Sequence, residues 1–372
     1  MPVQEPPFRA DHVGSLLRPQ AIIDARKKFF AGEIDEAQLK AVEDAEIPAL
    51  IKLQEDVGLK CVTDGEARRT FWHYDYMGML DGLDIETRDG SSFVGFKGVE
   101  LPPVYPAVTG KLDFPDDHPM LAHFKFVAKN TNVMPKISIP GPSCIHFRTA
   151  KKDVRYQPYL DDEEEYFADL VTTYRKAVDA FYEAGCRYLQ MDDIFFAYLC
   201  DPKHRADKEA EGADPDVLIR KYGEVLHEAI KDRPSDMYIG MHMCRGNFRS
   251  THAAEGAYDL AAESIFATGV DIFFMEYDTD RAGGLEPLKL LPKGNQIVLP
   301  GFITTKTPEL ESMDWLKSKF DEASKYVDIN QLGIAPQCGF SSTEHGNAVT
   351  MDDQRKKLEL VVRCAEEIWG GV

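Results

Sequence analysis

The feature that most constrains the fold is a repeated alternation of short apolar runs with longer helical stretches. The apolar runs are "ADHVGS", "KCVTDGE", "VMPKISIPGP", "YLQMDD", "MYIGMHMC", "DIFFMEYD", "QIVLPGFIT" and "LGIAPQCG". Most of them are nearly continuous rather than alternating, which is typical of parallel strands that are buried on both faces. A strand followed by a helix, about eight times over, predicts an α/β fold of the (β/α)8 barrel type.

Helical periodicity fills most of the spaces between these runs. Six stretches are expected to be helical: 36–57, 166–182, 215–231, 251–268, 309–326 and 352–369. Residues 68–130 contain too much Pro and Gly for a regular unit, so we expect an excursion inserted after the second strand. Residues 201–216 are expected to form a solvated loop. Barrels often exceed the usual domain length, and residues 1–372 are therefore predicted to form one domain.

Charge and targeting features exclude several classes of protein. The formal net charge of −20 argues against partners such as nucleic acids or anionic membranes, which bind through excess Lys and Arg. The sequence begins without a secretory pattern and has no apolar run long enough to span a membrane, which predicts a cytoplasmic protein. The seven cysteines are odd in number and scattered, so we expect reduced thiols that are free to bind a metal.

Potential metal ligands follow three of the predicted strands. His242 and Cys244 end one strand, Glu276 ends the next, and Cys338 ends the last. In a parallel barrel the carboxyl ends of the strands meet at one face, and zinc takes about four ligands from thiolate, imidazole and carboxylate groups. The pattern therefore permits a four-ligand zinc site. The alternative is that these side chains belong to the core, because free cysteines are commonly buried and short motifs often match by chance.

Six short motifs, taken together, resemble a known family. They are "HVGS", "DGEARR" at 64–69, "QMDD" at 190–193, "MHMC", "MEYD" and "PQCGF", and they occur in the order found in the catalytic domain of cobalamin-independent methionine synthases. The resemblance extends from about Phe8 to Trp369. It implies a barrel that binds Zn²⁺ through His242, Cys244, Glu276 and Cys338. The full-length synthases carry a second, N-terminal copy of the barrel, so this sequence is expected to group with the shorter relatives, whose chemistry is more varied.

The resemblance also implies a methyltransferase with two small-molecule partners, a homocysteine-like thiol and a methyl donor. Ser15 would bind the α-carboxylate of the thiol substrate, and Glu66 and Asp192 would bind its α-ammonium. Each residue has a simpler alternative: Ser15 could cap a turn, Glu66 could pair with a neighbouring arginine, and Asp192 could cap the next helix. His345 follows Cys338 closely and is a candidate catalytic proton donor, although a loop at a helix start would equally explain its position.

The expected site for the methyl donor departs from the folate-using members of the family. Those enzymes place a Trp after the "GP" of the third strand, whereas this sequence has His146, Phe147 and Arg148. Where they carry an Asp and a catalytic His, it has Thr304 and Lys306. We therefore do not carry methyltetrahydrofolate over as the donor, which stays open, and residues 146–148 and 304–306 could line a site for another alkyl source. The segment "FWHYDYM" at 71–77 could form an aromatic wall over the substrate or simply pack on the barrel.

Other functions remain open at this stage. The epoxyalkane:coenzyme M transferases use related zinc ligands, and the uroporphyrinogen decarboxylases have the same barrel without the metal. Asp192 and Glu66 suit an amino acid better than a sulfonate, and the complete ligand set argues against a metal-free enzyme. A further alternative is a protein without catalysis, in which the zinc only braces the barrel.

Overall fold

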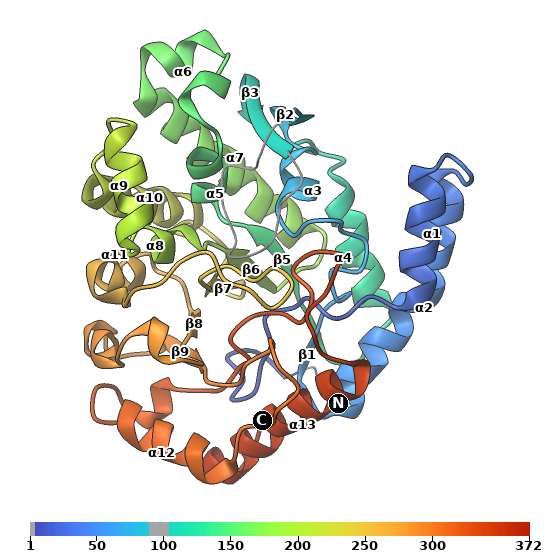
Figure 1. Cartoon of the computed structure of the whole chain (residues 1–372), viewed down its shortest axis with the longest axis vertical. Coiled ribbons are helices and arrows are strands. Elements are labelled where there is room, and N and C mark those ends of the chain that lie inside the picture. Colours follow the sequence, from blue (N-terminus) through green and yellow to red (C-terminus); the bar gives the residue numbers. More distant parts are fainter. Residues whose placement is uncertain (1–3, 89–103) are drawn as a thin grey trace.

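A five-stranded parallel sheet positions the candidate functional residues of this protein. The computed structural model describes residues 4–88 and 104–372. The strands of this sheet lie side by side in chain order, with Asp192 opposite His242 and Glu276 opposite Gly301. They are β5 (Ile137–Pro140), β6 (Tyr188–Asp192), β7 (Tyr238–Met243), β8 (Ile272–Glu276) and β9 (Ile297–Gly301). The carboxyl ends of β6, β7 and β8 therefore meet at one edge, as the sequence pattern predicts (Figure 1).

The remaining parallel pairings are short. Strand β1 (Cys61–Val62) pairs with β4 (Met134–Pro135), which is separated from β5 only by Lys136. The first and last apolar runs are joined by a single parallel bridge between Ala10 and Ile334. The run at 332–336 also bridges to β9 and to Ile303. The prediction of an α/β protein with parallel strands is confirmed, whereas the described pairings do not form one continuous eight-stranded sheet.

Helices cover the outside of these strands (Figure 1). They are α1 (Gln20–Phe30), α2 (Glu36–Asp56), α3 (Tyr74–Met77), α4 (Pro119–Lys129), α5 (Pro142–Arg148), α6 (Gln157–Asp161), α7 (Glu163–Glu183), α8 (Phe195–Tyr198), α9 (Pro202–Ala210), α10 (Pro215–Ile230), α11 (Ala262–Phe266), α12 (Met313–Ala323) and α13 (Met351–Trp369). Five of the six predicted helices are confirmed, with ends that shift by up to four residues. Local capping explains one of these shifts, because Ser312 accepts the N–H of Trp315 and starts α12 later than expected.

Two predictions about local structure are wrong. The predicted helix at 251–268 is reduced to α11 and a short 3-10 turn at Tyr258–Leu260, because the chain before it folds back around the buried side chain of Arg245. The predicted loop at 201–216 contains helix α9. Asp201 accepts the N–H groups of Lys203 and His204, and Pro202 occupies the first helical position. The Asp-Pro pair is a typical helix start, but the many charged residues of this segment led to the prediction of a loop.

In the part of the predicted excursion at 68–130 that the structure describes, there are two antiparallel strands and two helices. Strands β2 (Asp81–Thr87) and β3 (Val104–Asp113) pair antiparallel, with α3 before them and α4 after them. The part of the excursion at 89–103 lies outside the described residues. Among the residues that the structure describes, no helix is both long and apolar enough to cross a membrane.

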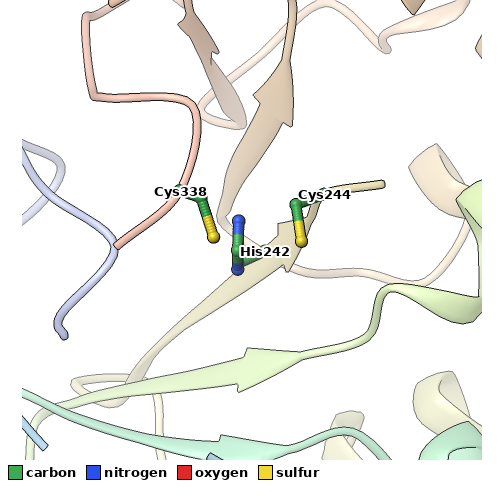
Figure 2. A group of neighbouring side chains, drawn as sticks. All are labelled: His242, Cys244 and Cys338. Carbon is green, nitrogen blue, oxygen red and sulfur yellow. The ribbon is translucent and has the colours of Figure 1, made fainter. Parts of the chain in front are cut away.

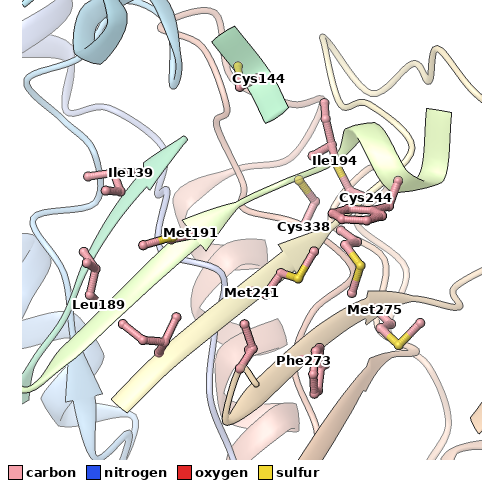
Figure 3. Packing of buried hydrophobic residues seen from close by; sticks show 14 of the residues in the cluster. Ile139, Cys144, Leu189, Met191, Ile194, Met241, Cys244, Phe273, Met275 and Cys338 are labelled. Atoms are coloured by element: carbon pink, nitrogen blue, oxygen red, sulfur yellow. The ribbon is translucent and has the colours of Figure 1, made fainter. Parts of the chain in front are cut away.

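The strands supply a buried core that also includes two of the predicted metal ligands. Ile139, Leu189, Met191, Met241, Phe273 and Met275 all belong to it, and they lie in the same cluster as Cys244 and Cys338 (Figure 3). Gly301 allows the last apolar run to approach β9, because a Cβ there would come within 2.4 Å of the Gln337 Cα. This close approach fixes the segment that carries Cys338.

Acid should destabilise the fold through His118, which is 1% exposed. Its ring stacks on Phe114, and its Nδ1 accepts the N–H of Met120, which requires the neutral imidazole. Burial lowers the pKa of His118 to about 4. Because this pKa lies below that of the unfolded chain, the stabilisation is complete above about pH 6.5 and is lost as the pH falls towards 4, by about 3 kcal/mol.

The variant His118→Asn tests this effect, since Asn keeps a helix-capping acceptor but does not titrate. Urea unfolding at pH 7 and pH 4 should show a smaller acid loss of unfolding free energy for the variant. Equal losses in the two proteins would contradict the assignment to His118.

Candidate metal centre

Strand β7 and the last apolar run bring three of the four predicted ligands together. His242 is opposite Asp192 of β6, and Cys244 follows the end of β7 on the same side of the extended backbone. Cys338 comes two residues after the bridge between Ile303 and Pro336. The ligand atoms of His242, Cys244 and Cys338 all lie within 4.8 Å of one another, and all three residues are buried (Figure 2).

The three groups favour a negative charge on one sulfur. A hydrogen bond from Cys244, aided by His242, holds the pKa of the Cys338 thiol well below its usual value despite burial. The same contact, together with burial, raises the pKa of the Cys244 thiol. Burial opposes a charge on His242, but Asp192 and Cys338 outweigh it and raise the pKa of this imidazole to about 10. The site therefore stabilises a thiolate when a cation lies next to it.

Glu276, the fourth predicted ligand, has other partners in this structure. It ends β8 and is fully buried, and its Oε1 accepts a hydrogen bond from Arg281. Its Oε2 accepts the backbone N–H of Arg245 at 2.9 Å. Burial would favour the protonated acid, but the charges of Lys306, Arg281 and Arg245 lower the pKa of Glu276 to about 2. The carboxylate is thus ionised close to Cys244, although it is not part of the three-residue cluster.

The donor set fits a zinc ion. Two cysteine sulfurs and one imidazole nitrogen are ligands that zinc prefers, and their mutual separation suits a tetrahedral ion with Zn–S bonds of about 2.3 Å. The Nδ1 of His242 lies 3.3 Å from Asp192 Oδ1 but makes no hydrogen bond of good geometry. A metal-binding imidazole commonly contacts a carboxylate in this way, which orients the ring.

A second buried group, Asp11, His12 and Cys61, has similar spacing but a different character. The Asp11 carboxylate already accepts hydrogen bonds from Lys136 Nζ at 2.7 Å and from the Tyr188 hydroxyl at 2.6 Å. Lys136 is fully buried and supplies the positive charge that a metal would otherwise bring. This group is therefore a structural ion pair within the sheet rather than a metal site.

A pocket with an empty volume of about 730 Å³ opens on the metal cluster. Its lining includes His242, Cys244 and Cys338 together with all three predicted substrate-binding residues, Ser15, Glu66 and Asp192. These residues come from five separate stretches of the sequence, which meet around one cavity. A small molecule in the pocket could contact the sulfur ligands and the carboxylates at the same time.

Of the two carboxylates of the pocket, Glu66 forms the ion pair with a neighbouring arginine that was its simpler alternative, whereas Asp192 does not form the predicted helix cap. Asp192 does not cap helix α8, and its Oδ1 accepts a hydrogen bond from Gln190 at 2.8 Å. Glu66 receives a hydrogen bond from Ser138 on Oε1, but its buried Oε2 has no hydrogen-bond partner and lies 3.7 Å from Arg69. Burial and the charge of Asp192 raise the pKa of Glu66 to about 7, against the opposing effect of Arg69. A bound ammonium group would satisfy this arrangement.

Backbone geometry also marks the substrate side of the pocket. Glu66 has a φ of 54°, which is uncommon for a residue other than glycine and is often found at functional sites. Ser15 lies against Gly339, where a Cβ would meet its Oγ at 1.8 Å. The segment after Cys338 therefore packs tightly on the segment that carries Ser15.

His345 is placed differently from the other predicted residues. It is exposed, it packs edge-on against Phe248, and it is not among the residues that line the pocket. Its proposed role as a proton donor would require the side chain to turn towards the pocket. The sequence did not point to Arg281, which contacts Glu276. The segment at 71–77, predicted as a possible aromatic wall, does line the pocket through Phe71, Trp72, His73 and Tyr74.

Comparison with known proteins assigns the family. The model for "Cobalamin-independent synthase, Catalytic domain" matches residues 8–367. The chain belongs to this family. It is 42% identical to "Uncharacterized protein YxjH" of Bacillus subtilis, covering 98% of this chain and 95% of that protein. A solved structure from Listeria monocytogenes, named "Putative Vitamin-B12 Independent Methionine Synthase", is 40% identical, with a TM-score of 0.79 over 99% of both chains.

A more distant relative has a named activity. The "5-methyltetrahydropteroyltriglutamate--homocysteine methyltransferase" of Aeromonas salmonicida is 24% identical over 89% of this chain, which spans only 40% of that longer protein. The resemblance seen in the motifs is thus confirmed at the level of the family. The α/β fold is likewise that of the family's catalytic domain.

Proposed function

We propose that this protein is a zinc-dependent methyltransferase that methylates the thiol of homocysteine or a similar amino acid. The observation that carries the proposal is the shared pocket, in which the His242, Cys244 and Cys338 cluster lies beside the carboxylates of Glu66 and Asp192. We further infer that the eight apolar runs form a single (β/α)8 barrel over residues 1–372, with the pocket at the carboxyl ends of its strands.

The residues of the pocket bind and orient the thiol substrate. Asp192 and Glu66 bind the α-ammonium group, and its positive charge shifts Glu66 to the ionised form. Ser15 binds the α-carboxylate. These contacts hold the substrate sulfur at the metal cluster, so part of the barrier is met by positioning. When bound, zinc lowers the pKa of a thiol that joins it, and so supplies a thiolate at neutral pH.

The methyl transfer itself is a simple displacement. The substrate sulfur forms a bond to the methyl carbon while the bond between that carbon and the donor breaks, and the donor keeps the electron pair. The proton of the thiol has already left to solvent. Cys244 and Cys338 contribute negative charge next to the sulfur, which keeps it electron-rich.

Glu276 is proposed as the fourth zinc ligand, with Arg281 as its alternative partner. The incoming thiol would displace the carboxylate, and Arg281 together with the Arg245 N–H would then hold it, as they do in this structure. This exchange distinguishes a catalytic site from a structural one, which is closed by four protein ligands.

The variant Arg281→Met tests the exchange. Without the guanidinium, the Glu276 carboxylate should bind zinc more persistently, so zinc affinity should rise by about ten-fold and homocysteine affinity should fall by a similar factor. Both affinities can be measured, the first by chelator competition and the second by calorimetry. A fall in zinc affinity would contradict the exchange, because Arg281 would then support the ligand rather than compete for it. Arg175→Gln on the surface of α7 is the control.

The methylation reaction has a direct assay. Purified protein with Zn²⁺ and homocysteine is offered methyltetrahydrofolates, methylcobalamin, S-methylmethionine and other methyl donors in parallel, and methionine is measured. Methionine from at least one donor, lost in Cys338→Ser, supports the proposal. Tight zinc binding without any zinc-dependent thiol binding would favour a bracing metal instead.

A further inference from the structure

One side of the pocket contains a buried arginine, Arg148, for which the described residues provide no partner of opposite charge. Arg148 ends helix α5, lines the pocket and is 8% exposed. Its Nη1 donates a hydrogen bond to the Tyr74 hydroxyl at 3.3 Å, while its Nε is buried without a hydrogen-bond partner. Within 4–88 and 104–372, no carboxylate forms an ion pair with it. A buried cation of this kind is costly unless an anion completes the site.

Neutral groups surround this guanidinium. Its Cζ lies 5.5 Å from the ring of Tyr74 and 5.6 Å from that of Phe195. Burial raises the pKa of the Cys144 thiol to about 12 and also raises the pKa of the Tyr74 hydroxyl, so neither group carries a negative charge at neutral pH. Arg148 thus lies over the rings of Tyr74 and Phe195 without meeting a negative charge there.

His73 adds a second unsatisfied polar group to the same side. It is 4% exposed and lines the pocket, and neither of its ring nitrogens has a hydrogen-bond partner. Burial, assisted by the charge of Arg148, holds the pKa of His73 well below its usual value. The neutral ring therefore offers one donor and one acceptor to a ligand in the pocket.

This side of the pocket lies next to the metal cluster. The Trp72 N–H donates to the Ser342 carbonyl at 3.1 Å, and Phe71 forms an antiparallel bridge with Thr343. Ser342 Oγ is in turn 3.6 Å from Cys338 Sγ. A ligand held by Arg148 and His73 would therefore share the pocket with a thiol at the metal cluster.

We propose that Arg148, His73 and the aromatic segment at 71–74 form the methyl-donor subsite, and that the donor carries an anionic group such as a carboxylate or phosphate. The inference rests on the proposed methyl transfer and deepens it. Arg148 binds the anion, His73 hydrogen-bonds a polar atom of the donor, and Trp72 and Phe71 cover its apolar part. Donors without any anionic group should bind poorly, because nothing in them would compensate the charge of Arg148.

A binding experiment with four matched probes tests this subsite on the intact protein. Benzoate, phenyl phosphate, benzamide and benzylammonium share one ring and differ in charge, and calorimetry gives the affinity of each. Benzoate or phenyl phosphate should bind about ten-fold or more tightly than benzamide, and benzylammonium should bind most weakly. The tighter of the two anions identifies the kind of acid group. The assay needs neither zinc nor a thiol, so its result is independent of the test for methionine formation.

Variants assign the preference to Arg148. Arg148→Gln should reduce the preference for the anion to within about two-fold, Arg148→Lys should retain part of it, and the surface control Arg175→Gln should leave it unchanged. The Lys variant keeps the positive charge, so the role of Arg148 can still be measured with it if the Gln variant fails to fold. Equal affinity for the anion and benzamide, tighter binding of benzylammonium, or no binding of either anion would overturn the proposal.

Discussion

Cys244→Ser and Cys338→Ser are each expected to lose zinc. Serine is close in size to cysteine, but its hydroxyl has a much higher pKa and is a poor zinc ligand, so each variant removes one thiolate from the cluster. Zinc affinity should fall by roughly a hundred-fold or more. Metal content after dialysis and chelator competition both measure the loss.

Cys186→Ser is the matched control for these variants. Cys186 is also fully buried, and its thiol donates to the Tyr188 carbonyl at 3.3 Å, a hydrogen bond that serine can keep. This variant should retain one zinc per chain. Stoichiometric zinc in both Cys244→Ser and Cys338→Ser would refute the assignment of the ligands.

Asp192→Asn is expected to weaken thiol-substrate binding while leaving the metal in place. The amide removes the negative charge that should face the substrate ammonium, and loss of one member of a buried charge pair costs about 2 kcal/mol or more, roughly thirty-fold in affinity. Zinc affinity should fall much less than in the cysteine variants, although His242 loses a contact at 3.3 Å. Calorimetry with homocysteine on the zinc-loaded protein gives the effect.

The neighbouring Asp193→Asn provides the control for this experiment. Asp193 is fully buried, and burial raises its pKa to about 7, so it is only about half ionised at pH 7 and the amide removes about half a charge. Asp193 does not belong to the residues that line the pocket. Homocysteine affinity should stay within about two-fold of the parent protein. A similar loss in both variants would mean that Asp192 acts through the structure rather than through the substrate.

The metal cluster could be predicted from the sequence because it depends on strand order. Parallel strands end at one edge, so a His-x-Cys at the end of one strand and a Cys at the end of another must lie near each other. The same reasoning placed Glu276 in the cluster, but it could not reveal Arg281 as a competing partner. That contact depends on the turn after β8, where the sequence gives no periodic signal.

The wrong predictions arose where local packing outweighed composition. The charged segment at 201–216 became helix α9 because Asp201 and Pro202 start it, and the apolar segment at 251–268 lost most of its helix to the loop that surrounds Arg245. The buried environment of Arg148 was likewise invisible in the sequence. Arg148 is packed against Tyr74 of the excursion and Phe195 of α8, which are far apart in the chain.

X-ray absorption at the zinc edge, with and without homocysteine, tests the central claim most directly. The account predicts two sulfur ligands on the zinc in the free protein and three in the presence of homocysteine, with one oxygen ligand lost as Glu276 returns to Arg281. An unchanged coordination shell on addition of homocysteine would contradict catalysis at this metal. A shell with one sulfur would place the ion elsewhere, for example at Asp11, His12 and Cys61.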